Sequence, residues 1–231
     1  MSKSNFAGFD QSLMKFLKQL ARNNNREWFQ ENKSRYEQDL LKPCLSFIKE
    51  FEPRLKKVSS YFVANDSRVG GSLMRIYRDT RFAKDKTPYK TNVGIHFRHE
   101  MGKDVHAPGF YVHIAPGECF LGAGIWCPPT DSLGKIRNAI IDEQAKWKRA
   151  RDNKRFRETF DLTKESLKSV PRGYAKDHPL IEDLKLISFC GLQAISESDV
   201  TSDFFIDDVA NSFSASRPYM RFLCDALKIP F

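Results

Sequence analysis

The residues best suited to chemistry in this 231-residue sequence form one dense basic stretch from Arg75 to Asn92. Six cations lie between positions 75 and 90 with two carboxylates among them, Asp79 and Asp85, so six positive charges less two negative leave +4 of the chain's formal +9. The cations are Arg75, Arg78, Arg81, Lys84, Lys86 and Lys90. Crowded guanidinium and ammonium groups repel one another unless carboxylates or a bound anion lie between them. The stretch therefore predicts a place where a phosphate or carboxylate group binds.

A basic and partly aromatic pocket is the function that this stretch favours. We expect its anion-binding side chains to be Arg75, Arg78, Arg81, Lys86 and Lys90. We expect aromatic side chains from the adjoining strands to form the floor of the pocket, namely Tyr77, Tyr111, His113 and Trp126. An aromatic side chain of an earlier helix, Trp28 or Tyr36, would form its wall. Guanidinium forks suit phosphate and carboxylate oxygens, and aromatic faces suit a base or sugar ring. The residues leave open whether a reaction takes place; if one does, His113 or Asp79 would act as its acid or base.

Two other interpretations stay open. In the first, Asp79, Asp85 and carboxylates elsewhere neutralise the cations, and the stretch is a scaffold that binds no ligand. In the second, the cluster joins a second basic run at 146–157 in one stripe that binds nucleic acid, with aromatic rings stacking on the bases. A solvated helix face is the plainer explanation of the second run. The acids and Pro88 that interrupt the central cluster favour a shaped pocket over a smooth nucleic-acid track.

Four histidines lie close together in the sequence, but their spacing does not favour a metal site. They are His96, His99, His106 and His113. His96 and His99 are an odd number of residues apart, so on a regular strand they point to opposite faces. The sequence also lacks a Gly-x-Ser-x-Gly nucleophile turn and a phosphate-binding Gly-x-x-x-x-Gly-Lys loop. We therefore predict neither a metal site nor a cofactor.

The hydrophobic pattern predicts a single α+β domain over residues 1–231. Residues 10–58 read as helical, residues 73–127 as an antiparallel sheet with the basic loop, and residues 131–228 as helical again. We expect the helices to pack mainly on one face of the sheet, as is common for antiparallel sheets.

The sheet should contain the residues of the pocket. Two-residue alternation predicts strands at 73–78 and 93–98, on either side of the basic loop, and a hairpin over 109–126. Gly122 and Gly124 share one face of the last strand. A glycine in such a place marks a bulge or lets a ligand or another backbone come close.

Small polar residues mark the expected ends of several helices. Asp10 should cap the first helix, and the run Asn23 to Asn25 should end it and begin the next. Asp131 or Ser132 should cap the helix after the sheet, and Ser216 should cap the last one.

Composition places the protein in a reducing compartment with acidic partners. Five cysteines, an odd number without a Cys-x-x-Cys pair, predict free thiols. The first ten residues lack the apolar core of a signal peptide, and no apolar run reaches membrane-spanning length, so we expect a cytoplasmic protein without a membrane association. A pI near 9.3 favours partners such as phosphorylated metabolites or nucleic acid.

Several blocks of the sequence resemble the hallmark motifs of a family of conserved hypothetical proteins, domain of unknown function 2461. The resemblance implies one compact domain, found in bacterial and fungal proteins, without an assigned activity. It supplies no catalytic roles for individual residues, so the expected site above depends on the residues alone. The blocks are Asn-Asn-Asn-Arg-Glu-Trp-Phe (23–29), the whole basic stretch (75–92), Gly-Phe-Tyr-Val-His-Ile (109–114), Gly-Ala-Gly-Ile-Trp (122–126) and Pro-Arg-Gly-Tyr (171–174).

Overall fold

A five-stranded antiparallel sheet forms the centre of the computed structural model, which describes residues 6–102 and 106–231. The strands lie in the order β1-β2-β3-β5-β4. They are β1 (Val93–Arg98), β2 (Gly109–Ala115), β3 (Glu118–Ile125), β4 (Asp161–Leu162) and β5 (Phe189–Ile195). The predicted α+β class and the antiparallel sheet in the middle of the chain are confirmed.

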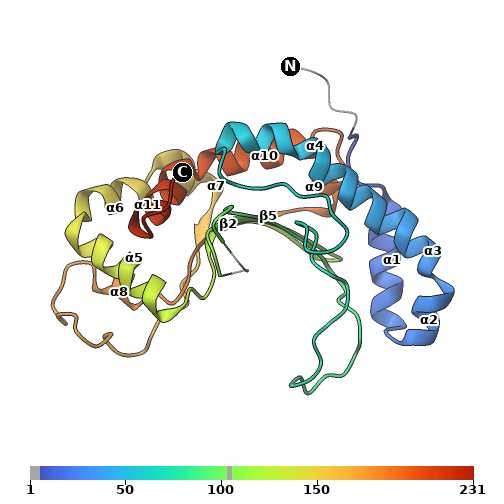
Figure 1. The fold of residues 1–231 in the computed structure, drawn as a ribbon, viewed down its shortest axis with the longest axis horizontal. Coiled ribbons are helices and arrows are strands. Elements are labelled where there is room, and N and C mark those ends of the chain that lie inside the picture. The colour runs from blue at the N-terminus through green and yellow to red at the C-terminus, as the bar shows by residue number, and fades with distance from the viewer. Residues whose placement is uncertain (1–5, 103–105) are drawn as a thin grey trace.

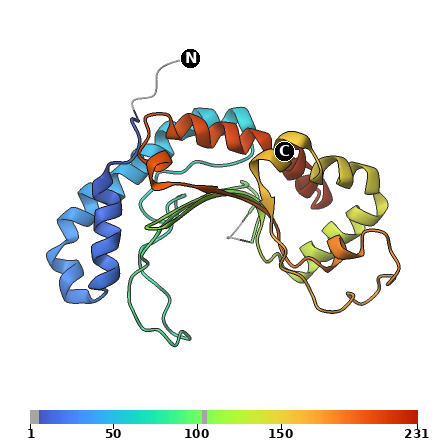
Figure 2. The same cartoon turned by 180° about the vertical axis from the view of Figure 1, so that it is seen from behind.

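Alternation along the strands gives the sheet one apolar face, and two helices cover it. The helices are α4 (Lys42–Val58) and α10 (Phe205–Ala215). Ring centroids of Phe97 and Phe51 are 4.9 Å apart, and those of Phe110 and Phe213 are 4.8 Å apart. Burying each such ring stabilises the fold by roughly 2 to 3 kcal/mol. Figures 1 and 2 show α4 and α10 over this convex face, and none of the described helices crosses the concave face, so the packing predicted on mainly one face is confirmed.

The other N-terminal helices lie at one end of the sheet (Figure 1). They are α1 (Gln11–Arg22), α2 (Arg26–Glu31), α3 (Lys33–Arg35) and the π-helical segment η1 (Tyr36–Leu41). The Asp10 side chain accepts a hydrogen bond from the Ser12 N–H at 2.7 Å, and Asn25 accepts one from the Trp28 N–H at 2.9 Å. The predicted cap and the predicted break at Asn23 to Asn25 are therefore confirmed.

The C-terminal helices lie mostly at the other end of the sheet (Figures 1 and 2). In addition to α10 they are α5 (Thr130–Asp142), α6 (Gln144–Arg151), α7 (Lys154–Thr159), α8 (Ile181–Lys185), α9 (Glu197–Val200) and α11 (Arg217–Ala226). Two predicted caps are wrong. Helix α5 begins directly after Pro129 without a side-chain cap, so neither Asp131 nor Ser132 serves as one. The Ser216 hydroxyl donates backward to the Phe213 carbonyl at 2.9 Å instead of capping α11.

The segment 131–228, predicted as helical throughout, also supplies β4 and β5, and the prediction is wrong there. Strand β5 pairs with β3 along its whole length, from Phe189 opposite Ile125 to Ile195 opposite Cys119. A seven-residue stretch interrupted by Gly191 has too little periodicity of its own to mark a strand. Its extended state depends on the neighbouring strand, which is a tertiary effect.

The basic stretch forms a projecting arm, which we define as residues 72–92. The strand predicted at 73–78 is wrong in extent, because only isolated bridges form, from Leu73 to Ile95 and from Tyr77 to Tyr89. The first bridge attaches the base of the arm to β1, and the second joins the arm's own two sides. Figures 1 and 2 show the arm leaving the sheet and extending away from it on the concave side. A short, twisted pair of segments without further neighbours cannot continue the regular ladder of a sheet.

Candidate functional site on the concave sheet face

A cavity of about 410 Å³ lies on the concave face of the sheet. Its walls come from β1, β2, β3, β5, the base of the arm and the segment after β4. Pockets for small molecules are typically a few hundred cubic ångströms and mainly apolar, with a few polar groups that orient the ligand. The size and place of this cavity therefore fit a small-molecule site.

Glycines leave the floor of the cavity open. Gly109 of β2 lies opposite Gly124 of β3, and Gly122 of β3 lies opposite Tyr111 of β2. All three glycines line the cavity. A Cβ at Gly122 would meet nothing closer than 3.5 Å, whereas one at Gly124 would lie 2.0 Å from the Phe189 carbonyl oxygen. The sequence suggested that such glycines let either another backbone or a ligand come close, and each explanation applies to a different glycine. Gly124 lets the β5 backbone approach, and Gly122 leaves space in the cavity.

Tyr111 and His113 form a hydrogen-bonded pair on this face. Alternation along β2 directs both side chains to the concave side, and the Tyr111 hydroxyl lies 3.1 Å from Nδ1 of His113. The His113 ring stacks on Phe120 of β3, with centroids 4.5 Å apart. Burial raises the pKa of Tyr111 to about 12, and burial lowers the pKa of His113 although Glu118 acts in the opposite direction. Near neutral pH the pair is uncharged, and such a pair can accept or donate a proton toward a ligand.

Two buried polar atoms of the cavity walls lack hydrogen-bond partners. They are Nδ1 of His96 and Oγ1 of Thr163. The His96 side chain is only 9% exposed, and burial, helped by the charge of Arg98, lowers its pKa to about 4. The imidazole is therefore neutral at pH 7. A buried polar atom without a partner costs about 1 to 3 kcal/mol, and atoms elsewhere in the described structure, such as Tyr219 Oη, share this state.

The rim of the cavity combines an aromatic stack with a carboxylate. Trp126 is half-exposed and stacks on His106, with ring centroids 5.6 Å apart. Glu165 follows β4 and accepts a hydrogen bond from the buried Ser188 hydroxyl at 3.4 Å. Among the residues that the structure describes, no lysine or arginine lines the cavity.

The guanidinium groups at the tip of the arm are paired with carboxylates. Arg78 lies 2.5 Å from Asp85, and Arg81 lies 2.7 Å from Asp79. The hydrogen bond from Arg81 lowers the pKa of Asp79 to about 2, so this carboxylate is a weak base. Asp79 thus has neither a place in the cavity nor the basicity that its predicted catalytic role requires. In this part of the arm the arrangement matches the scaffold interpretation, with the Lys86 ammonium donating to the Thr80 carbonyl at 2.9 Å.

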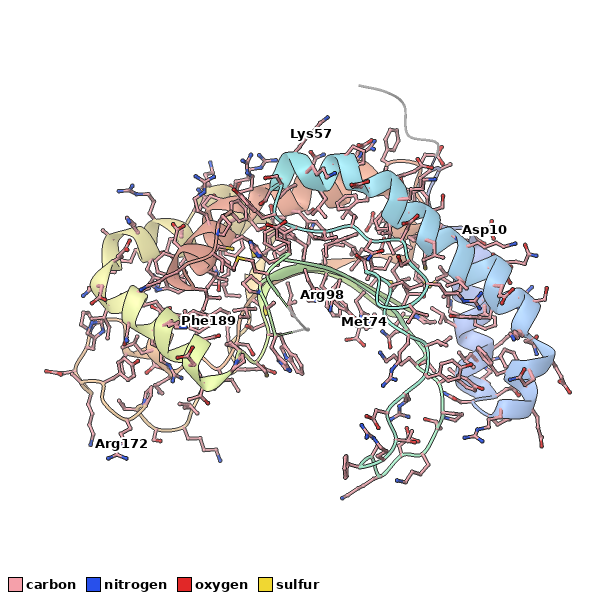
Figure 3. All side chains as sticks on the ribbon, in the orientation of Figure 1. Asp10, Lys57, Met74, Arg98, Arg172 and Phe189 are labelled. Carbon is pink, nitrogen blue, oxygen red and sulfur yellow. The ribbon has the colours of Figure 1, made fainter. Side chains whose placement is uncertain are left out.

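The remaining predicted residues divide between the cavity and its surroundings. Tyr111, His113 and Trp126 line the cavity together, as expected. Arg75 and Lys90 do not line the cavity; they belong to the base of the arm, where Met74, labelled in Figure 3, contributes to a cavity wall.

The three other predicted aromatic residues lie outside the cavity: Trp28 and Tyr36 in the N-terminal helices and Tyr77 in the arm. Trp28 packs on Phe16 at 5.8 Å, and Tyr36 packs on Phe29 at 5.2 Å. Tyr77 contacts Tyr89 at 5.4 Å. These rings hold the arm and the N-terminal helices together instead of forming a wall of the cavity.

The second basic run, 146–157, does not continue the arm. It forms α6 and α7, which Figures 1 and 2 place at the opposite end of the sheet from the arm. Several of its cations have local partners, such as Arg151 with Asp183 at 2.6 Å and Lys146 with Glu143. One continuous stripe through both basic segments is therefore not present in the described structure.

Sequence reasoning missed part of the cavity. His96 was considered only as a metal ligand, although its alternation with Ile95 and Phe97 already placed it on the polar face of β1. Thr163 and Glu165 could not be found, because their position depends on β4 and β5. Within residues 6–102 and 106–231, no three histidine, cysteine or acidic side chains converge to hold a metal ion.

The fold and the cavity define an α+β domain whose antiparallel sheet is packed with helices on one face and hollowed by a pocket on the other. The chain belongs to the family described as conserved hypothetical protein (DUF2461), whose model matches residues 12–222. No curated protein and no solved structure matches the chain. Across the described segments, none of the helices combines the length and apolar character needed to cross a membrane, and all five cysteines are free thiols. The N-terminal segment read for a signal peptide begins in residues 1–5, which lie outside the described residues.

Proposed function

We propose that this protein binds a small ring-bearing molecule with a phosphate or carboxylate group in the concave-face cavity. The observation that carries the proposal is a cavity with aromatic walls whose lining also includes a few polar side chains, namely His96, Thr163 and the hydrogen-bonded pair Tyr111 and His113. Sites for small molecules typically combine apolar walls with a few polar groups that orient the ligand. The rings of His113, Phe120 and Trp126 supply flat surfaces for a ring of the ligand.

The anionic group of the ligand is proposed from the charge of the arm. The cavity itself contains Glu165 and no cation among its described lining residues, so an anion would contact the protein at the mouth, where the arm begins. Whether the bound molecule also reacts depends on the Tyr111–His113 pair, which is placed to exchange a proton with it.

A library of aromatic and sugar phosphates and carboxylates, with their uncharged parent compounds, would test the proposal by protein-observed NMR. We expect some members to shift the side-chain signals of Trp126, His96 and His113 in a saturable manner. A library in which no member shifts these signals would refute the proposal. A single-stranded oligonucleotide is included at two salt concentrations, because tighter binding of the oligomer with a steep salt dependence would indicate nucleic-acid binding instead.

Replacing Thr163 with valine should weaken binding while leaving the free protein as stable as before or slightly more stable. The substitution keeps the shape and removes a buried hydroxyl that has no partner, and a lost hydrogen bond to a ligand is worth about 1 kcal/mol, or roughly fivefold in affinity. Calorimetric titration of the best library member and a urea denaturation curve measure the two effects.

Thr201→Val is the matched control, because the Thr201 hydroxyl donates to the Glu197 and Ser198 carbonyls in α9 and does not line the cavity. This control should lower stability slightly and leave affinity unchanged. Equal affinity in the wild type and Thr163→Val would show that the hydroxyl does not face the ligand.

A further inference from the structure

The cations of the arm fall into two groups with different surroundings. The guanidinium groups at the tip have carboxylate partners, as described above. At the base, the side chains of Arg75 and Lys90 have neither a hydrogen bond nor an ion pair to any residue in the described parts of the chain. Arg75 helps to lower the pKa of Asp79, but that carboxylate is already engaged by Arg81, so the two neighbouring cations share little negative charge. A ligand that supplied negative charge would therefore be favoured there.

The two cations lie close enough at the base of the arm for Arg75, which is exposed, to act on the charge of Lys90, and the segment that carries Arg75 adjoins the cavity wall. The Lys90 N–H donates to the Ile76 carbonyl at 2.7 Å, which places Lys90 across the arm from the segment that includes Arg75. Met74, the residue before Arg75, lines the cavity, and its N–H donates to the Gly94 carbonyl of β1 at 2.9 Å. The base of the arm is thus fixed to the first strand of the sheet at the edge of the cavity.

The surroundings of Lys90 disfavour its positive charge in the absence of a ligand. Its side chain is half-buried, and burial, together with the charge of Arg75, lowers the pKa of the ammonium group. An anion that contacts both groups would restore the electrostatic balance and would be held by charge-assisted hydrogen bonds.

We propose that Arg75 and Lys90 form the anion subsite for the ligand of the concave cavity, an inference that rests on the proposed function. A subsite at this position also determines how the ligand is oriented in the cavity. The arm attaches to β1, at one edge of the sheet, whereas Glu165 follows β4, at the other edge. The ligand therefore belongs to a narrower class: a ring compound with a phosphate or carboxylate at one end and hydrogen-bond donors, such as an amino group, at the other.

Inorganic phosphate is the probe that tests the subsite separately from the cavity. The melting temperature is measured as phosphate replaces chloride at constant ionic strength, for the wild type and two double variants. Arg75→Gln with Lys90→Gln removes the subsite. Lys84→Gln with Lys86→Gln removes the same charge from the tip of the same arm and serves as the control.

We expect phosphate to raise the melting temperature of the wild type and of the control, and to have little effect on the subsite variant. Without phosphate the subsite variant should melt at the same temperature as the wild type or higher, because it loses a half-buried cation that has no partner. The affinity of a phosphate-bearing library member should fall at least about tenfold in the subsite variant, since each lost charge-assisted hydrogen bond is a strong one. Its uncharged parent should bind both proteins alike.

An equal response to phosphate in all three proteins would overturn the subsite, because it would show general salt effects only. A loss of the response in both double variants would also overturn it, since net charge would then be the cause. These outcomes would remove the anion contact at the base of the arm but not the binding of the ring part in the cavity, which the library titration and Thr163→Val test separately.

Discussion

Replacing Gly124 with alanine should destabilise the protein by about 3 kcal/mol or more. Gly124 has a φ of 144°, which a residue with a Cβ rarely adopts, and the added Cβ would lie 2.0 Å from the Phe189 carbonyl oxygen and 2.7 Å from the Cα of Cys190. Both obstacles are backbone atoms of β5, which cannot move without breaking the pairing of β3 with β5. Urea denaturation followed by circular dichroism measures the loss.

Gly122→Ala is the matched control on the same strand and the same face. Its Cβ would make only ordinary contacts, the nearest at 3.5 Å from Leu192 and Tyr111, so we expect a change within about 1 kcal/mol. If both alanine variants unfold at the same urea concentration as the wild type, the explanation that the nearby β5 backbone requires a glycine at position 124 is wrong. A larger residue at position 122 should leave the fold intact and obstruct the cavity.

The protein should lose about 3 kcal/mol of stability as the pH falls from 6.5 to 4, because of His96. Burial lowers the pKa of His96 to about 4 in the folded state, compared with 6.5 when the side chain is free. Between these values the unfolded chain takes up a proton that the folded chain does not, so acid favours unfolding. The stabilising effect is complete above pH 6.5 and is lost as the pH falls toward 4. Arg98 acts in the same direction as burial, and the ring of Tyr111, 6.3 Å away, carries no charge in this range.

His96→Phe should remove this pH dependence, as measured by urea denaturation at pH 4.5 and pH 7.5. The same substitution at His178, in the loop before α8, keeps a histidine at position 96 and should retain it. His113 is partly buried and its pKa is also lowered, so a smaller slope should remain in His96→Phe. If His96→Phe shows the same loss of stability in acid as the wild type, His96 is not the group that titrates.

The helices, the first three strands and the single sheet could be predicted from the sequence because their signals are local. Asp10 and Asn25 cap helices through bonds to residues two or three positions away, and Phe110, Val112 and Ile114 alternate along β2. The same alternation placed Tyr111 and His113 together on the opposite face, where the cavity lies. The predictions were wrong where the strand conformation of a segment depends on pairing with residues distant in the sequence, as in β5 and in the short bridges of the arm.

The sequence by itself determined which residues carry charge, which alternate, and therefore which face of the central hairpin is polar. It could not determine which arginine would meet which carboxylate, because the distance between two charges depends on the path of the backbone between them. Only the tertiary structure paired Arg78 with Asp85 and Arg81 with Asp79 and left the side chains of Arg75 and Lys90 without a hydrogen bond or ion pair to the described residues. It also brought Thr163 and Glu165 to the wall opposite β1, since strand order is set by the packing of the whole sheet and not by any one segment.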